Sequence, residues 1–121
     1  MSNTAKSERL NPMVITDPDT GREYTLEFSR KTVSKTEQAG FDMNKLESMG
    51  MTMIPLMFWG AFLMHHPHMT KDQTDKILFD GLGGLNDEEL NRLGALYAEP
   101  FKSLIANEGA TENPRKMAVK F

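Results

Sequence analysis

The sequence predicts an α+β domain, mostly helical, in which an N-terminal β-hairpin packs on four to five α-helices. Two observations lead to this fold class. Apolar and polar residues alternate over residues 13–28, and later apolar residues recur at helical spacing behind capping residues. A chain of 121 residues can bury one core but not two. We therefore expect a flexible arm over residues 1–11, a single domain over 12–106 and a flexible C-terminal tail over 107–121.

Residues 13–28 have the pattern of a β-hairpin. Tyr24, Leu26 and Phe28 fall on one face of the second strand, and polar residues fall on the other. Between the strands, residues 17–21 (Asp-Pro-Asp-Thr-Gly) have the composition of a tight turn. An isolated hairpin is marginally stable in water, so its apolar face must lie on helices or on another chain.

The rest of the chain predicts helices. Thr70 with Gln73, and Asn86 with Glu89, have the spacing of capping boxes. Ile77, Leu78 and Phe79 are predicted to point toward the core, and Pro100 predicts a break near Glu99 because a proline inside a helix costs about 3 kcal/mol. The predicted helical regions are 29–39, 44–50, 52–66, 70–81 and 86–106.

Methionine is the unusual feature of the composition. Seven of the ten methionines lie within residues 43–69. The run 53–64 is apolar all round, and at twelve residues it is too short for a membrane span of about 20. It therefore predicts a buried helix. The alternative is that one side of this helix faces another subunit or an apolar client, because methionine adapts to varied partners. The partner-binding candidates are Met53, Met57, Trp59, Phe62 and Met64.

No pattern in the sequence indicates catalysis, a cofactor or a metal site. The absence of cysteine excludes disulfides and thiolate chemistry, and a net charge of −3 gives no attraction to nucleic acid or anionic membranes. His65, His66 and His68 lack the further ligands of a metal site and are expected to cap the last carbonyls of the preceding helix. The N-terminus lacks the apolar stretch of a secretory signal. We therefore expect a cytoplasmic protein that is not an enzyme.

Three runs of residues appear in a distinctive order: YTLEFSRKTV at 24–33, QAGF at 38–41 and MTMIPLMFWGAF at 51–62. With the hairpin before them and a late helix broken at Glu-Pro, the chain resembles the small tail assembly chaperones of siphophages and prophages of Gram-positive hosts. The resemblance covers roughly residues 13–106. It implies a non-enzymatic role in the cytoplasm of the bacterial host, with the tape measure protein and the tail tube protein as partners.

Two questions stay open at the level of sequence. Self-association into a homo-oligomer is compatible with the apolar surfaces that the pattern predicts. The second question is the class of phage protein, because a structural virion component, such as a tail terminator or head-tail connector, would also be small and acidic.

Overall fold

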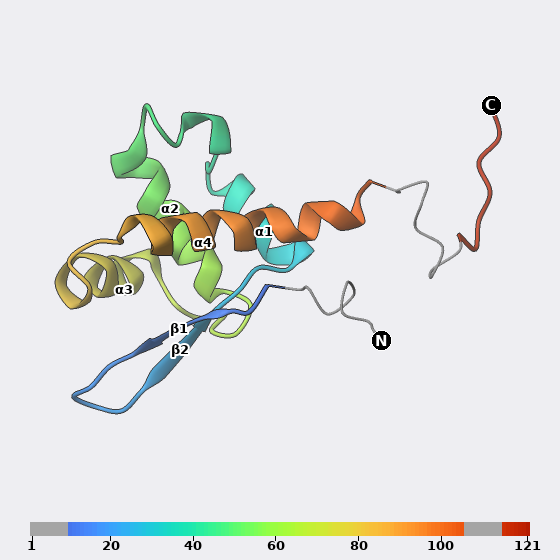
Figure 1. The fold of residues 1–121 in the computed structure, drawn as a ribbon. Coiled ribbons are helices and arrows are strands. Elements are labelled where there is room, and N and C mark those ends of the chain that lie inside the picture. Colours follow the sequence, from blue (N-terminus) through green and yellow to red (C-terminus); the bar gives the residue numbers. More distant parts are fainter. Residues whose placement is uncertain (1–9, 106–114) are drawn as a thin grey trace.

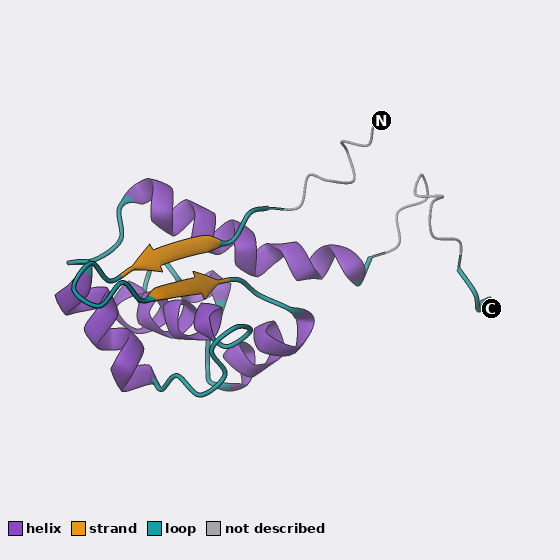
Figure 2. Cartoon of the chain, turned by 90° about the horizontal axis from the view of Figure 1, so that it is seen from below, coloured by secondary structure: helices purple, strands orange, loops and turns teal. Residues whose placement is uncertain are grey.

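The computed structural model describes residues 10–105 and 115–121. It confirms the predicted fold class, because a two-stranded antiparallel hairpin precedes a set of helices (Figures 1 and 2). Residues 1–9 of the expected arm and 106–114 of the expected tail lie outside the described residues. The elements are β1 (Met13–Thr16), β2 (Glu23–Leu26), α1 (Arg30–Gln38), η1 (Met43–Lys45), α2 (Gly50–Phe62), α3 (Lys71–Lys76), η2 (Ile77–Gly81), α4 (Asp87–Ala98) and η3 (Glu99–Ser103).

Helix α2 is the centre of the fold. It contacts α1, α3, α4, η1 and β2. In Figure 1, α4 and η3 form a long rod that crosses α2, and Figure 2 shows the hairpin lying on one face of the helices. Surrounding α2 with other elements buries most of its apolar surface, as the uniformly apolar run predicts.

The hairpin follows the predicted turn chemistry. The strands pair in the register Met13↔Leu26 to Thr16↔Glu23. In the turn, the Asp17 carboxylate accepts a hydrogen bond from the Asp19 N–H at 2.9 Å, and Gly21 has a φ of 76°, which glycine adopts without strain. Leu26 and Phe28 are buried, in agreement with the alternation in the sequence.

The outer edge of β2 is attached to the end of α2. The Glu27 N–H donates to the Ala61 carbonyl at 2.9 Å, and the Thr25 N–H donates to Nε2 of His66 at 3.0 Å. Burial lowers the pKa of His66, and electrostatic interactions with His65 and Arg22 lower it further. Nε2 of His65 lies 2.8 Å from Oε1 of Glu27. The expectation that these two rings cap helix carbonyls was wrong, because the hairpin offers them closer partners.

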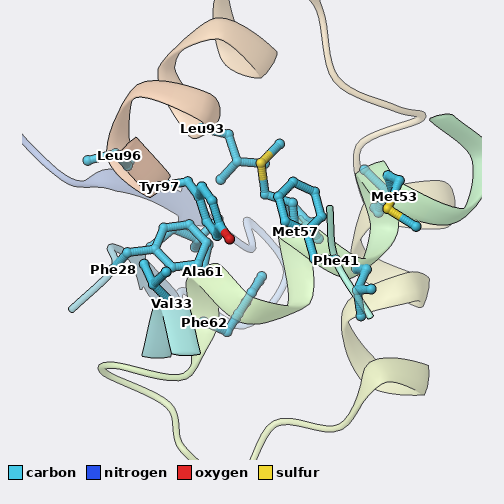
Figure 3. Packing of buried hydrophobic residues seen from close by; sticks show 14 residues of the cluster. Phe28, Val33, Phe41, Met53, Met57, Ala61, Phe62, Leu93, Leu96 and Tyr97 are labelled. Atoms are coloured by element: carbon cyan, nitrogen blue, oxygen red, sulfur yellow. The ribbon is translucent and has the colours of Figure 1, made fainter. Parts of the chain in front are cut away.

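Tyr97 on α4 is packed between two phenylalanine rings. Its ring centroid lies 5.1 Å from that of Phe28 and 4.8 Å from that of Phe41 (Figure 3). Burial raises the pKa of Tyr97 to about 12, and the carboxylates of Glu37 and Asp42 act in the same direction. The largest fully buried apolar side chains of the same core are Leu26, Met57, Phe58, Phe62 and Leu93.

Helices α1 and α2 approach each other closely at Gly60. Thr36 of α1 lies against this glycine, is fully buried, and donates its hydroxyl to the Thr32 carbonyl at 2.7 Å. The space beside Gly60 is filled by the Thr36 side chain, so no Cβ fits there. A glycine at this position therefore allows the crossing of the two helices.

The observed ends of the helices can be compared with the ends that the sequence predicts. The capping boxes at Thr70 and Asn86 form as predicted, and α4 gives way to η3 at Glu99, where Pro100 was expected to break it. Helix α2 differs: it begins at Gly50, two residues before the expected Thr52, and its N-cap residue Met49 makes no side-chain cap hydrogen bond.

Candidate functional site

The five residues predicted to bind a partner do not form one surface. Met53, Met57 and Phe62 are buried in the core, as Figure 3 shows. Trp59 is half-buried, and its indole N–H donates to the Met69 carbonyl at 3.1 Å. Met64, just beyond the end of α2, is 38% exposed. Within one chain, three of the five candidates thus have a structural role in the core.

An apolar groove lies on the opposite half of α2 from Met64. It runs between the first half of α2, the turn η2 and the start of α4, and it has a volume of about 350 Å³. Only apolar side chains and two glycines form its walls. The lining residues are Gly50, Met51, Ile54, Pro55, Leu78, Phe79, Gly84, Leu85 and Leu90.

Phe79 forms one edge of the groove because the helix widens at η2. The Leu82 N–H donates to the Ile77 carbonyl, five residues back, at 2.8 Å, which is the hydrogen bond of a π-helical turn. Leu78 is buried, whereas Phe79 is 49% exposed. The prediction that Ile77, Leu78 and Phe79 all face the core was wrong for Phe79. Successive helical residues diverge by about 100°, so three in a row cannot share one face.

The chain can leave this turn because two glycines follow it. Gly83 and Gly84 have φ values of 69° and 98°, and the Gly84 N–H donates to the Leu78 carbonyl at 2.8 Å. This hydrogen bond satisfies a carbonyl at the helix end and brings Leu85 back toward the groove. The glycines at the end of η2 therefore help to form the groove wall.

Met51 forms the opposite edge. It lies in the first turn of α2 and is 86% exposed, the highest value among the large apolar residues of the described helices. Met51 also lines a second hollow of about 520 Å³ on its other side, together with Ala39, Thr52, Leu56, Trp59 and Lys71. The unbranched thioether of Met51 thus stands between two depressions, and Trp59 contributes to the second one.

Charges around the groove are mostly negative. Residues 71–89, which supply α3, η2 and the start of α4, contain six acidic and two basic side chains, a formal charge of −4. One of the two lysines, Lys71, is paired with Asp75 at 3.1 Å. The groove itself contains no titratable side chain. It can bind apolar groups, and its surroundings favour ligands that also carry positive charge.

Sequence reasoning missed Met51 and Phe79 for different reasons. Met51 precedes Thr52, so it was placed outside the predicted helix. Phe79 was assigned to the core with its neighbours, although Thr74 and Leu78 already define a buried face four residues apart. A helical wheel centred on that pair places Phe79 about 120° away, outside the buried face. For Met51 the sequence holds no comparable signal.

Among residues 10–105 and 115–121 there is no cluster of three or more His, Asp or Glu side chains that could hold a metal ion. In the same described part of the chain, no helix is both long and apolar enough to cross a membrane.

The fold and the groove define a class: a small, mainly helical α+β domain with an open apolar groove beside its central helix. The chain belongs to the DUF5055 family, described as a domain of unknown function, whose model matches residues 1–121. Neither a curated protein nor a solved structure matches it.

Proposed function

We propose that this protein is a tail assembly chaperone of the siphophage type. It acts in the cytoplasm of the bacterial host, binds apolar segments of the tape measure protein, and assists assembly of the tail tube protein around them. Support for the class comes from the resemblance of residues 13–106. The observation that carries the binding role is the apolar groove between Met51 and Phe79, which a single chain leaves open.

The groove suits a client whose sequence varies. Its edges are Met51, which is largely exposed, and Phe79, which is about half exposed, and methionine repacks readily against different shapes. An elongated client presents many apolar segments, so a site without fixed polar contacts can bind several of them. Specificity for one sequence would require buried polar groups, and the groove lining has none.

Its size also predicts weak, reversible binding. Two or three client side chains fill about 350 Å³, and each contributes about 1.5–3 kcal/mol when buried. The entropic cost of association is at least about 4 kcal/mol, so at most about 5 kcal/mol remains, which corresponds to a Kd of roughly 0.2 mM or weaker for one site. Binding of that strength protects a client during assembly and still allows its release when tube subunits replace the chaperone.

Co-expression with the tape measure protein tests the proposal. We expect more soluble client with the wild-type chain than without it, and a loss of that effect for the double variant Met51→Asp with Phe79→Asp. The matched control is the double variant Leu104→Asp with Ile105→Asp, which introduces the same two charges at apolar residues that are 65% and 76% exposed beyond η3. Equal client solubility with the groove variant and with the wild-type chain would show that the groove is not the client site.

Purified virions distinguish the chaperone from a structural component. An assembly chaperone leaves before the particle is complete, so mass spectrometry should not detect the chain in virions. Its presence at a fixed stoichiometry would instead identify a tail terminator or connector and overturn the proposed function.

A further inference from the structure

The C-terminal segment, residues 115–121, has a pattern that the fold does not use. Its sequence is Arg-Lys-Met-Ala-Val-Lys-Phe, in which Met117, Val119 and Phe121 alternate with Lys116, Ala118 and Lys120. In an extended conformation, apolar side chains lie on one face and two lysines lie on the other. Met117 is 85% exposed, Val119 is 62% exposed and Phe121 is fully exposed. The segment thus presents an apolar face to solvent.

We infer that this C-terminal segment docks into the apolar groove of its own chain, with its apolar face against Met51 and Phe79. The structure shows the groove open and the segment exposed, so the docked form is a second conformation of the same molecule. Three apolar side chains spaced two residues apart match a groove lined only by apolar side chains and glycine.

Charge favours this occupant. The segment carries three basic residues and no acidic one, a formal charge of +3. Residues 10–105 contain nine basic and fourteen acidic side chains, a formal charge of −5, and four of these net negative charges belong to residues 71–89 beside the groove. Docking therefore brings positive side chains to the most acidic stretch of the folded part, with the lysines directed outward toward its rim.

The covalent connection is long enough for docking within one molecule. Ten residues of chain lead from Ile105 to Arg115 and can span at most about 35 Å. Leu90, in the groove wall, is fifteen residues before Ile105 along α4 and η3, roughly 25 Å at helical rise. Because a short tether gives an effective concentration in the millimolar range, even a weak contact is populated within one chain.

Docking would regulate the site of the proposed function. A segment that is docked ten times as often as it is free lowers the apparent affinity of the groove for any other ligand about tenfold. This consequence rests on the proposed function, whereas the docking itself concerns the chain alone. The two statements can therefore fail separately.

The absence of cysteine from the chain permits a direct test. The variant Ala118→Cys carries a single nitroxide spin label on the C-terminal segment, and the methionines carry ¹³C-labelled methyl groups. Docking predicts line broadening of the Met51 methyl signal several times larger than that of Met64, an exposed methionine past the opposite end of α2. Adding Met117→Glu, Val119→Glu and Phe121→Glu to the labelled chain should remove the difference.

Two results would overturn the inference. Equal broadening of Met51 and Met64 would show that the segment does not visit the groove. Equally strong broadening of Met51 in a mixture of spin-labelled, unenriched chains with ¹³C-labelled, unmodified chains would assign the contact to a second copy. The proposed function is tested separately, by measuring whether the triple Glu variant binds a fragment of the tape measure protein. If the segment docks and this variant binds no fragment, the inference stands and the tape measure protein is rejected as the client.

Discussion

The substitution Gly60→Ala tests the packing that holds the central helix. An alanine Cβ at this position overlaps Oγ1 of Thr36 and lies 2.9 Å from its Cγ2 and 3.0 Å from its Cβ. The threonine cannot yield easily, because it is fully buried and its hydroxyl donates to the Thr32 carbonyl at 2.7 Å. Its branched side chain also has few χ1 options inside a helix. Relief of the clash therefore requires Thr36 to leave its rotamer and its hydrogen bond to Thr32, and helices α1 and α2 to move apart.

The magnitude follows from three opposing effects. Alanine improves helix propensity by at most about 1 kcal/mol over glycine. Overpacking a core typically costs about 1–3 kcal/mol, and losing the buried Thr36 hydrogen bond costs about 1–3 kcal/mol more. Near the middle of these ranges, the free energy of unfolding falls by about 3 kcal/mol. This is a large part of the 5–15 kcal/mol that stabilises a typical domain.

Urea unfolding followed by far-UV circular dichroism and by the fluorescence of Trp59 measures the loss. The control is Gly94→Ala in α4, where an added Cβ meets no described atom within 4 Å, and which should gain about 0.5–1 kcal/mol. Thr36→Ala in the Gly60→Ala background removes Oγ1 and Cγ2 and should recover part of the stability. Equal stability of Gly60→Ala and Gly94→Ala would show that the side chain of Thr36 does not restrict position 60.

Further predictions concern the hairpin, a helix cap and the groove. The folded state favours neutral His66, whose pKa is lowered, so its contribution to stability is complete above pH about 6.5 and is lost as the pH falls through the lower folded pKa. Urea midpoints at pH 7.5 and 5 should therefore differ more for the wild-type chain than for His66→Gln, and an unchanged difference would contradict the role of His66. Asn86→Ala removes the side-chain acceptor of the Glu89 N–H at 2.8 Å and should cost about 1 kcal/mol, whereas exposed Asn91→Ala should cost less than about 0.5 kcal/mol. If the two cost the same, the cap adds no stability. Phe79→Asp should lower the free energy of unfolding by less than about 1 kcal/mol and still weaken binding of a hydrophobic dye, because Phe79 is 49% exposed. Unchanged dye binding would mean that Phe79 does not form a usable edge.

Local signals predicted the elements that depend on near neighbours. The capping boxes at Thr70 and Asn86 satisfy backbone donors within three residues, and the hairpin turn depends on Asp17 and Gly21, so neither requires the rest of the fold. The break at Pro100 is local in the same sense. These features were readable from the sequence because their stabilising contacts are short in sequence separation.

The groove depends on contacts between distant residues. Met51 and Phe79 are 28 residues apart, and they share a groove because α3 and η2 pack against α2. No capping side chain marks the start of α2 at Gly50 in the sequence. The apolar run predicted a buried helix correctly for Met53, Met57 and Phe62. The π-helical turn and the position of α4 determine which side chains remain exposed. Neither feature produces a periodic pattern in the sequence.

Site-specific photocrosslinking tests the central claim, that the groove between Met51 and Phe79 binds the tape measure protein. Benzoylphenylalanine replaces Phe79 in one variant and Ile105 in another, in cells that co-express the tape measure protein. We expect a crosslinked product with the tape measure protein from position 79 and little or none from position 105. Crosslinks of equal yield from both positions, or from position 105 alone, would contradict this claim.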